Sequence, residues 1–227
     1  MDNISNEMMF RGLIGHLWEG SSPDETLSKR YRLFVLTGAI LIALFALYRF
    51  FAGMDFLPNT EWIIPVLVVT GSFSLYCGSS RAWRIVTRYF GALAVMSALI
   101  VWFVTYGVLP IHAFCWSGFL LVWFFSMRSR VSIFDRLPRL LLRTTLTAAV
   151  AIIIYDVWTG LIGHSLVTGT SIWISLLGQI PFTLRHLTSL FFVPPLVGLG
   201  RIMIRIPVPV RASASIFSHQ KQKTGGD

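Results

Sequence analysis

The sequence predicts an all-α membrane protein, a six-transmembrane-helix bundle with both termini cytoplasmic. Three observations lead to this prediction: the composition, the apolar runs and the placement of basic residues. Of the 227 residues, 55% are hydrophobic and 13% are charged, whereas soluble domains carry roughly 25% charge. The mean hydropathy of +0.69 indicates more apolar surface than a water-soluble core can bury. We therefore expect a multi-pass protein of the cell membrane.

Six apolar runs supply the expected helices, since a spanning helix needs roughly 20 mostly apolar residues. The predicted spans are residues 33–52, 62–77, 85–106, 111–127, 140–158 and 180–203. Residues 168–179 are apolar but too short to span separately, so we expect a lid or a half-buried helix there. Ser22 and Pro23 resemble a helix start, with serine as the cap and proline in the first turn.

The chain divides into three parts. Residues 1–30 form a cytoplasmic N-terminal segment, whose apolar stripe is compatible either with an interfacial helix or with a loosely ordered tail. Residues 31–206 form the transmembrane domain, and residues 207–227 are polar enough to be a disordered cytoplasmic tail.

Basic residues set the expected orientation. Positive charge concentrates in cytoplasmic loops, and one side of the predicted bundle receives nearly all of it. That side holds Lys29, Arg30, Arg32, Arg81, Arg84, Arg88, Arg128, Arg130, Arg136, Arg139, Arg143, Arg201, Arg205 and Arg211. The other side holds Arg49 and Arg185. The net charge of +9 is thus explained by membrane topology, and no nucleic-acid partner is expected.

Polar residues are expected to meet near the outer end of the bundle. At about 1.5 Å per residue, Asp156 lies about 20 Å from Arg143, and His186 lies about 22 Å from Arg201. Ionisable groups inside spans are costly and usually functional. The candidate substrate-binding residues are Asn59, Glu61, Trp62, Asp156, Trp158, Arg185 and His186. Structural alternatives remain open, because tryptophans also form interfacial belts and Asp156 could pair with Arg185 or Arg49.

Small residues mark the first span. Ala39, Ala43 and Ala46 recur at helical spacing and form a flat stripe that another helix can approach closely. The stripe is compatible with docking of a partner or with packing inside the bundle.

Four segments of the chain together resemble a known family. They are Ala39-Ile-Leu-Ile-Ala43, Leu57-Pro-Asn-Thr-Glu61, Tyr155-Asp-Val-Trp-Thr159, and the last span with Pro181-Phe-Thr-Leu-Arg-His186 and Phe192-Val-Pro-Pro-Leu196. Their order over residues 33–205 resembles the substrate-binding S components of energy-coupling factor (ECF) transporters. Members often have an asparagine near the position of Ser189 and a glycine-richer loop after the second span, and these differences affect the substrate more than the fold.

The resemblance implies capture of a vitamin or cofactor precursor from outside, followed by delivery through a membrane T component driven by separate ATPases. It also implies that Ala39 and Ala43 are docking residues. Two other functions remain open: a structural or assembly subunit of a membrane complex, and a metal- or haem-handling protein that uses His112, His164, His186, Asp156 and Glu61. The sequence has no zinc-protease helix and no phosphate-binding loop. No enzymatic activity, catalytic residue, metal or cofactor is therefore expected.

Overall fold

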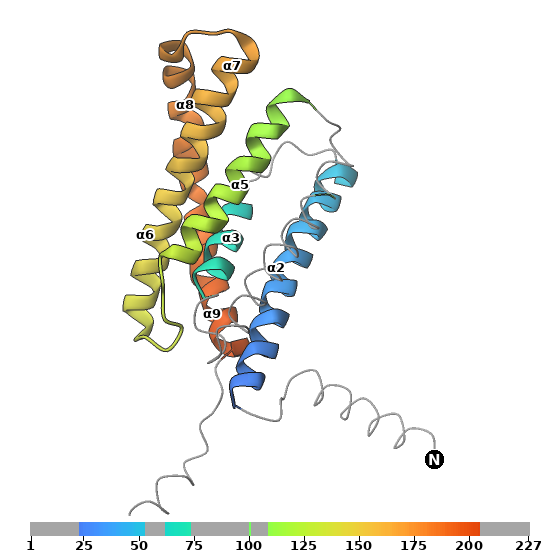
Figure 1. Ribbon diagram of the computed structural model, residues 1–227, viewed down its shortest axis with the longest axis vertical. Helices are drawn as coiled ribbons and strands as arrows, with labels where there is room; N and C mark the ends of the chain where they lie inside the picture. Colours follow the sequence, from blue (N-terminus) through green and yellow to red (C-terminus); the bar gives the residue numbers. More distant parts are fainter. Residues whose placement is uncertain (1–22, 53–61, 74–99, 101–108, 205–227) are drawn as a thin grey trace, which may run out of the picture.

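The computed structural model describes residues 23–52, 62–73, 100 and 109–204, and this part of the chain is all-helical (Figure 1). The helices are α2 (Pro23–Ala52), α3 (Ile63–Ser72), α5 (Pro110–Arg128), α6 (Leu137–Asp156), the π-helix η2 (Val157–Gly163), α7 (His164–Thr168), α8 (Ile172–Leu187), the 3₁₀-helix η3 (Thr188–Phe192) and α9 (Val193–Ile204). Three continuous helices are long and apolar enough to cross a membrane: Pro110–Arg128, Leu137–Thr168 and Ile172–Ile204.

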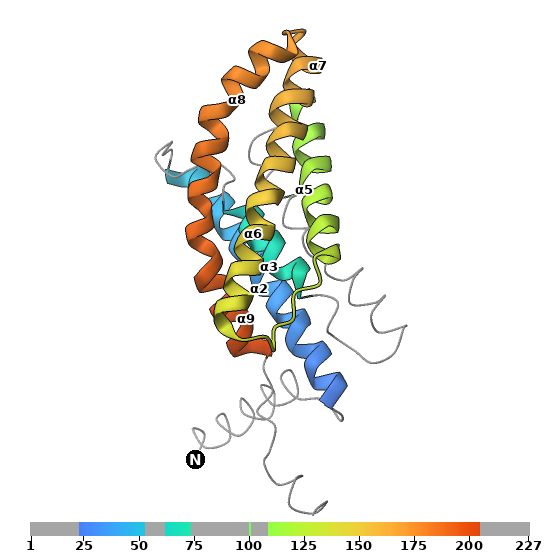
Figure 2. The same ribbon diagram turned by 90° about the vertical axis from the view of Figure 1, so that its left-hand side faces the viewer.

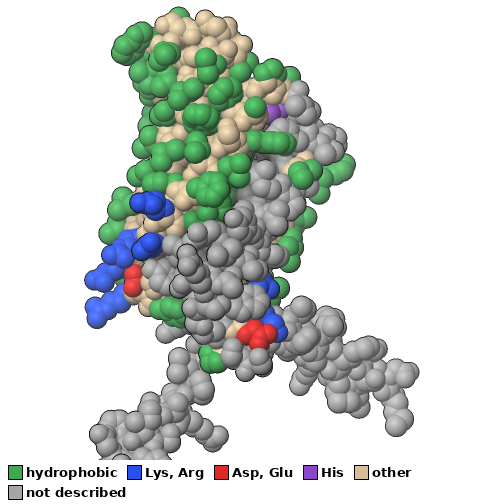
Figure 3. All heavy atoms as spheres, viewed as in Figure 1, with side chains coloured by type: hydrophobic (Ala, Val, Ile, Leu, Met, Phe, Trp, Pro, Cys, Tyr) green, Lys and Arg blue, Asp and Glu red, His purple; other side chains and the backbone are tan. Residues whose placement is uncertain are grey.

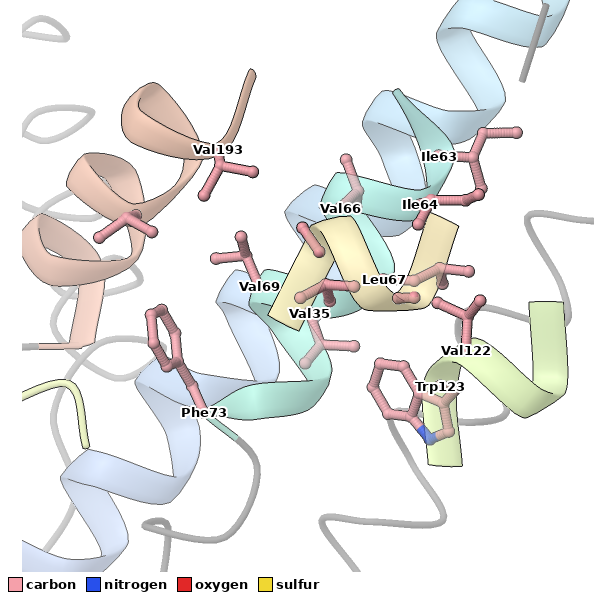
Figure 4. Close-up of a cluster of buried hydrophobic side chains, with 14 of the residues drawn as sticks. Val35, Ile63, Ile64, Val66, Leu67, Val69, Phe73, Val122, Trp123 and Val193 are labelled. Atoms are coloured by element: carbon pink, nitrogen blue, oxygen red, sulfur yellow. The ribbon is translucent and has the colours of Figure 1, made fainter. Parts of the chain in front are cut away.

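The short helix α3 lies at the centre of the bundle. All ten of its residues are buried, as expected for a helix that is apolar on every face. It contacts α2, α5, α6 and α9, and Figure 4 shows Val35, Val122, Trp123 and Val193 around it. The core is therefore built around α3, in the lower half of the molecule.

The basic residues lie toward one end of the bundle. The start of α2, the α5–α6 loop and the end of α9 meet at the lower end in Figure 1. Figure 3 shows Lys and Arg side chains in the lower half of this face and hydrophobic side chains above them. This confirms, for the described clusters, that the three basic segments share an end. The cluster from Arg81 to Arg88 lies outside the described residues.

A long helical hairpin runs along the length of the molecule, and its turn forms the upper end (Figure 2). Its first arm runs from Leu137 to Thr168 (32 residues) and its second from Ile172 to Ile204 (33 residues). At about 1.5 Å per residue each arm is about 48 Å long. The turn begins at Gly169, whose φ of 69° is left-handed and whose N–H donates to the carbonyl oxygen of Ser165 at 2.9 Å. This is the common glycine-type helix end.

The hairpin corrects two expectations. The fifth helix does not end at Trp158, because it passes through Gly160 and Gly163 as the π-helix η2 and continues to Thr168. Residues 168–179 were expected to form a lid or a half-buried helix separate from the sixth span. Residues 172–179 are helical, but they belong to one helix that begins at Ile172 and includes Pro181 in its interior. Proline and glycine are tolerated in apolar helices when neighbouring groups satisfy the freed backbone, so they do not mark helix ends here.

The other expected spans have mixed outcomes. Helices α2 and α5 confirm helical structure over residues 33–52 and 111–127. The predicted cap of α2, Ser22, lies outside the described residues. Helix α3 covers the first part of the second expected span. Nearly all of residues 85–106, together with residues 1–22 and 205–227, lies outside the described residues, so the count of six spans stays a prediction.

Candidate ligand-binding site

A buried ionisable pair joins the two arms of the hairpin. A hydrogen bond of 2.5 Å connects Nδ1 of His186 on α8 with Oδ1 of Asp156 at the end of α6. Asp156 is only 1% exposed, and His186 is largely buried. The second carboxylate oxygen of Asp156, Oδ2, is also buried and has no hydrogen-bond partner among the described residues. Burying a polar group without a partner is costly. Oδ2 of Asp156 can still accept a hydrogen bond, and such a bond would reduce this cost.

Both helices change their backbone pattern next to this pair. The π-helix η2 begins directly after Asp156, and the N–H of His164 bonds to the carbonyl of Thr159, five residues back. The 3₁₀-helix η3 begins two residues after His186. Its cause is Pro194 and Pro195, which have no N–H to offer to the carbonyls four residues before them. Such irregular turns occur frequently at functional sites and hinges.

A cleft of about 180 Å³ opens between the two arms beside the pair. One wall contains Ile153, Val157 and Leu161 from α6 and η2. The facing wall contains Leu176, Ile180 and Leu184 from α8. Three polar residues, Asp156, Gln179 and Thr183, complete the lining. The cleft is thus mostly aliphatic with a few polar groups, which is the usual composition of a small-molecule site.

The first arm of the hairpin, α6 with η2, packs tightly against α5. The ring of Tyr155 stacks on Phe119 with a centroid distance of 4.7 Å. The indole N–H of Trp158 donates to the hydroxyl of Ser117 at 2.8 Å, and its ring lies 5.8 Å from that of Phe114. A Cβ added to Gly163 would lie 2.6 Å from Phe114. Glycine at position 163 therefore permits the close approach that fixes η2 on α5.

The structure brings together two of the predicted site residues, Asp156 and His186. Trp158 points to α5 through its bond with Ser117, away from the cleft lining, and Arg185 is exposed on α8. Trp62 is buried in the core at the start of α3. Asn59 and Glu61 lie outside the described residues. The hydrogen-bond partner of Asp156 is His186, where the sequence had suggested an ion pair with Arg185 or Arg49 as a structural alternative.

The alanine stripe of α2 faces more than one environment. Ala39 is 7% exposed and belongs to the buried core, whereas Ala43 is half-buried. The side chain of Ala46 lies outside the described part. In this conformation Ala43 is therefore more accessible to a partner helix than Ala39.

Two other histidines in the described part of the chain, His112 and His164, have local structural contacts. Nδ1 of His112 accepts a hydrogen bond of 3.0 Å from the N–H of Leu109 at the start of α5. His164 lies in the hairpin turn, 3.3 Å from the hydroxyl of Ser175, which in turn accepts from Ser165 at 2.9 Å. Within the residues that the structure describes, no three His, Cys, Asp or Glu side chains gather into a metal site.

Gln179 and Thr183 were not among the predicted site residues. They lie four residues apart on α8, and Thr183 precedes His186 by three. Residues at these spacings share one face of a helix, so the helical spacing from His186 could have indicated both residues. A Cβ added to Gly160 would overlap the carboxamide of Gln179, which shows that this amide packs directly on the backbone of η2.

Comparison of the chain with known protein families, curated proteins and solved structures gives no match.

Proposed function

We propose that this protein is the membrane-embedded substrate-capture subunit of an ECF-type transporter. In this role it binds a small organic molecule, a vitamin or cofactor precursor, from outside the cell. The observation that carries the proposal is Asp156, a buried carboxylate with one oxygen paired to His186 and the other without a partner in the described structure, on the wall of an apolar cleft.

Several features support a binding protein over a purely structural subunit. A buried carboxylate in a spanning helix is expensive and is expected to have a use beyond packing. Hydrophobic residues would stabilise a helix interface as well as a buried ion pair does. The cleft and η2 lie directly on the turn side of the pair, and η3 follows His186 on its other side. Their adjacency favours a site that accepts a ligand.

The proposed partners follow from the resemblance noted in the sequence. Release of a bound molecule to the inside requires energy, and the sequence has no phosphate-binding loop with which to hydrolyse ATP. In the proposal, a T component docks on the small-residue stripe of α2 and couples the chain to two ATPases. Ala43, which is half-buried, is the best placed of the three alanines for this contact.

Native mass spectrometry of the freshly purified protein tests substrate capture. We expect a retained small molecule on the wild-type chain and its loss from Asp156→Asn. Leu177→Ala is the matched control, because Leu177 is exposed on α8 and does not line the cleft. A chain that releases no small molecule under these conditions, although correctly folded, would contradict the proposal.

The docking step has its own test. We expect Ala43→Leu to retain the small molecule but to lose co-purification with the T component and its ATPases. Ile40→Leu is the control, since Ile40 is exposed on the same helix and keeps its volume. Loss of the small molecule from Ala43→Leu would instead assign Ala43 to internal packing.

A further inference from the structure

We infer that the ligand of the cleft is a single-ring molecule that carries N–H donors and no net negative charge. This inference rests on the proposed substrate-capture function and specifies the chemistry of the same site. It follows from three properties of the cleft: its size, the polarity of its lining and the unpaired oxygen of Asp156.

The size of the cleft suits about one ring. An apolar cavity of about 150 Å³ accepts a benzene molecule, and this cleft has about 180 Å³. A ring with one or two small substituents therefore fits between its walls. The aliphatic walls formed by Val157, Leu161 and Ile180 would cover both faces of such a ring.

The polar groups favour hydrogen-bond donors on the ligand. Asp156 is the charged member of the described lining, and its Oδ2 can only accept while the carboxyl group is ionised. Gln179 and Thr183 are uncharged and can each either accept or donate a hydrogen bond, so they do not oppose a donor on the ligand. An amine, an ammonium group or an amino-substituted heteroaromatic ring would satisfy Oδ2.

The same groups disfavour anions. A carboxylate or phosphate beside Asp156 would meet a like charge in an apolar surrounding, where repulsion is weakly screened. His186 is already bonded to Oδ1 through Nδ1. The cleft is therefore expected to discriminate between ligands by charge as well as by size.

Three single-ring probes of similar size test the inference: benzylamine, benzyl alcohol and benzoate. Binding to ligand-depleted protein in nanodiscs is measured by saturation-transfer NMR, with empty nanodiscs subtracted. We expect benzylamine to bind at least tenfold more tightly than benzoate, with benzyl alcohol between them. Asp156→Asn should remove this preference, and Ile180→Trp should block all three probes by filling the cleft. Leu177→Ala should change neither result.

The outcomes separate this inference from the proposed function. If native mass spectrometry finds a retained molecule that is anionic, or if benzoate binds as well as benzylamine, the inferred ligand class is wrong and substrate capture stands. A benzylamine affinity that is unchanged in both Asp156→Asn and Ile180→Trp would also overturn the inference. If the folded protein retains no molecule and binds no probe, the proposed function falls and the inference with it.

Discussion

Asp156 differs from the residues around it because its two carboxylate oxygens have different surroundings. Oδ1 is bonded to His186, and Oδ2 is buried without a partner in the described structure. The hydrogen bond to His186 also crosses from one arm of the hairpin to the other. The pair therefore links the two arms directly beside the cleft.

Replacing His186 by alanine should destabilise the protein strongly. Removal of one partner leaves a buried carboxylate without compensation, which costs about 3 kcal/mol or more. Adding Asp156→Asn should recover part of this loss, because the uncompensated charge disappears. A double-mutant cycle measured by reversible unfolding in mixed micelles checks the coupling, and additivity within about 0.5 kcal/mol would show that the two residues do not interact.

Depth arithmetic placed Asp156 and His186 near the same level, because the helical rise is fixed and both residues were counted from basic anchors, but the pairing considered for Asp156 was with Arg185 or Arg49. The same arithmetic did not select Gln179 or Thr183. Uncharged polar residues are inexpensive in a span, so their presence carries little information until a neighbouring helix is placed. The cleft itself depends on the spacing between the arms, which the packing of Gln179 on Gly160 sets locally.

Among the helices, the hairpin arms show how glycine and proline can be misread. Gly160, Gly163 and Pro181 resemble helix ends in the sequence, yet the two arms pass through all three. Gly163 serves close packing against Phe114, and the helix ends at Gly169, where φ is positive. Which glycine ends a helix depends on tertiary contacts, and these are not visible from local sequence.

Two glycine-to-alanine substitutions separate packing from helix propensity. Gly163→Ala should destabilise the protein by about 1–3 kcal/mol, because the new methyl group overlaps Phe114. Gly178→Ala should be neutral or stabilising by up to about 1 kcal/mol, since a Cβ there meets open space and alanine favours the helix. Thermal unfolding of both variants checks this, and equal effects would show that η2 and α5 are less closely packed.

For the whole molecule, the grouping of basic residues at one end fits a bundle that spans the membrane with that end inside. The start of α2 and the end of α9 both lie at this end (Figure 1). The hairpin turn lies at the other. The described helices account for the expected bundle only in part, because the third predicted span lies outside them.

Single-cysteine labelling of intact cells tests this orientation. In a Cys77→Ser/Cys115→Ser background, a cysteine placed at Thr170 in the turn should react with a membrane-impermeant maleimide added outside. A cysteine placed at Phe134, which is exposed in the loop between α5 and α6, should react only after permeabilisation. Labelling of both positions from the same side would contradict a hairpin that spans the bilayer.

The length of the hairpin arms has a consequence for the surrounding lipid. Between its basic residues and the turn, the first arm (Arg143 to Thr168) is about 38 Å long and the second (Arg201 to Ile172) about 44 Å, whereas the hydrocarbon core of a bilayer is about 30 Å thick. A tilt of about 40° would be needed to absorb this difference, at the upper end of the usual range of roughly 0–40°. The tip is nevertheless apolar, with Ile172, Trp173 and Ile174 largely exposed. This hydrophobic mismatch predicts local thickening of the outer leaflet around the tip, so the stability of the hairpin should rise in bilayers made of longer acyl chains.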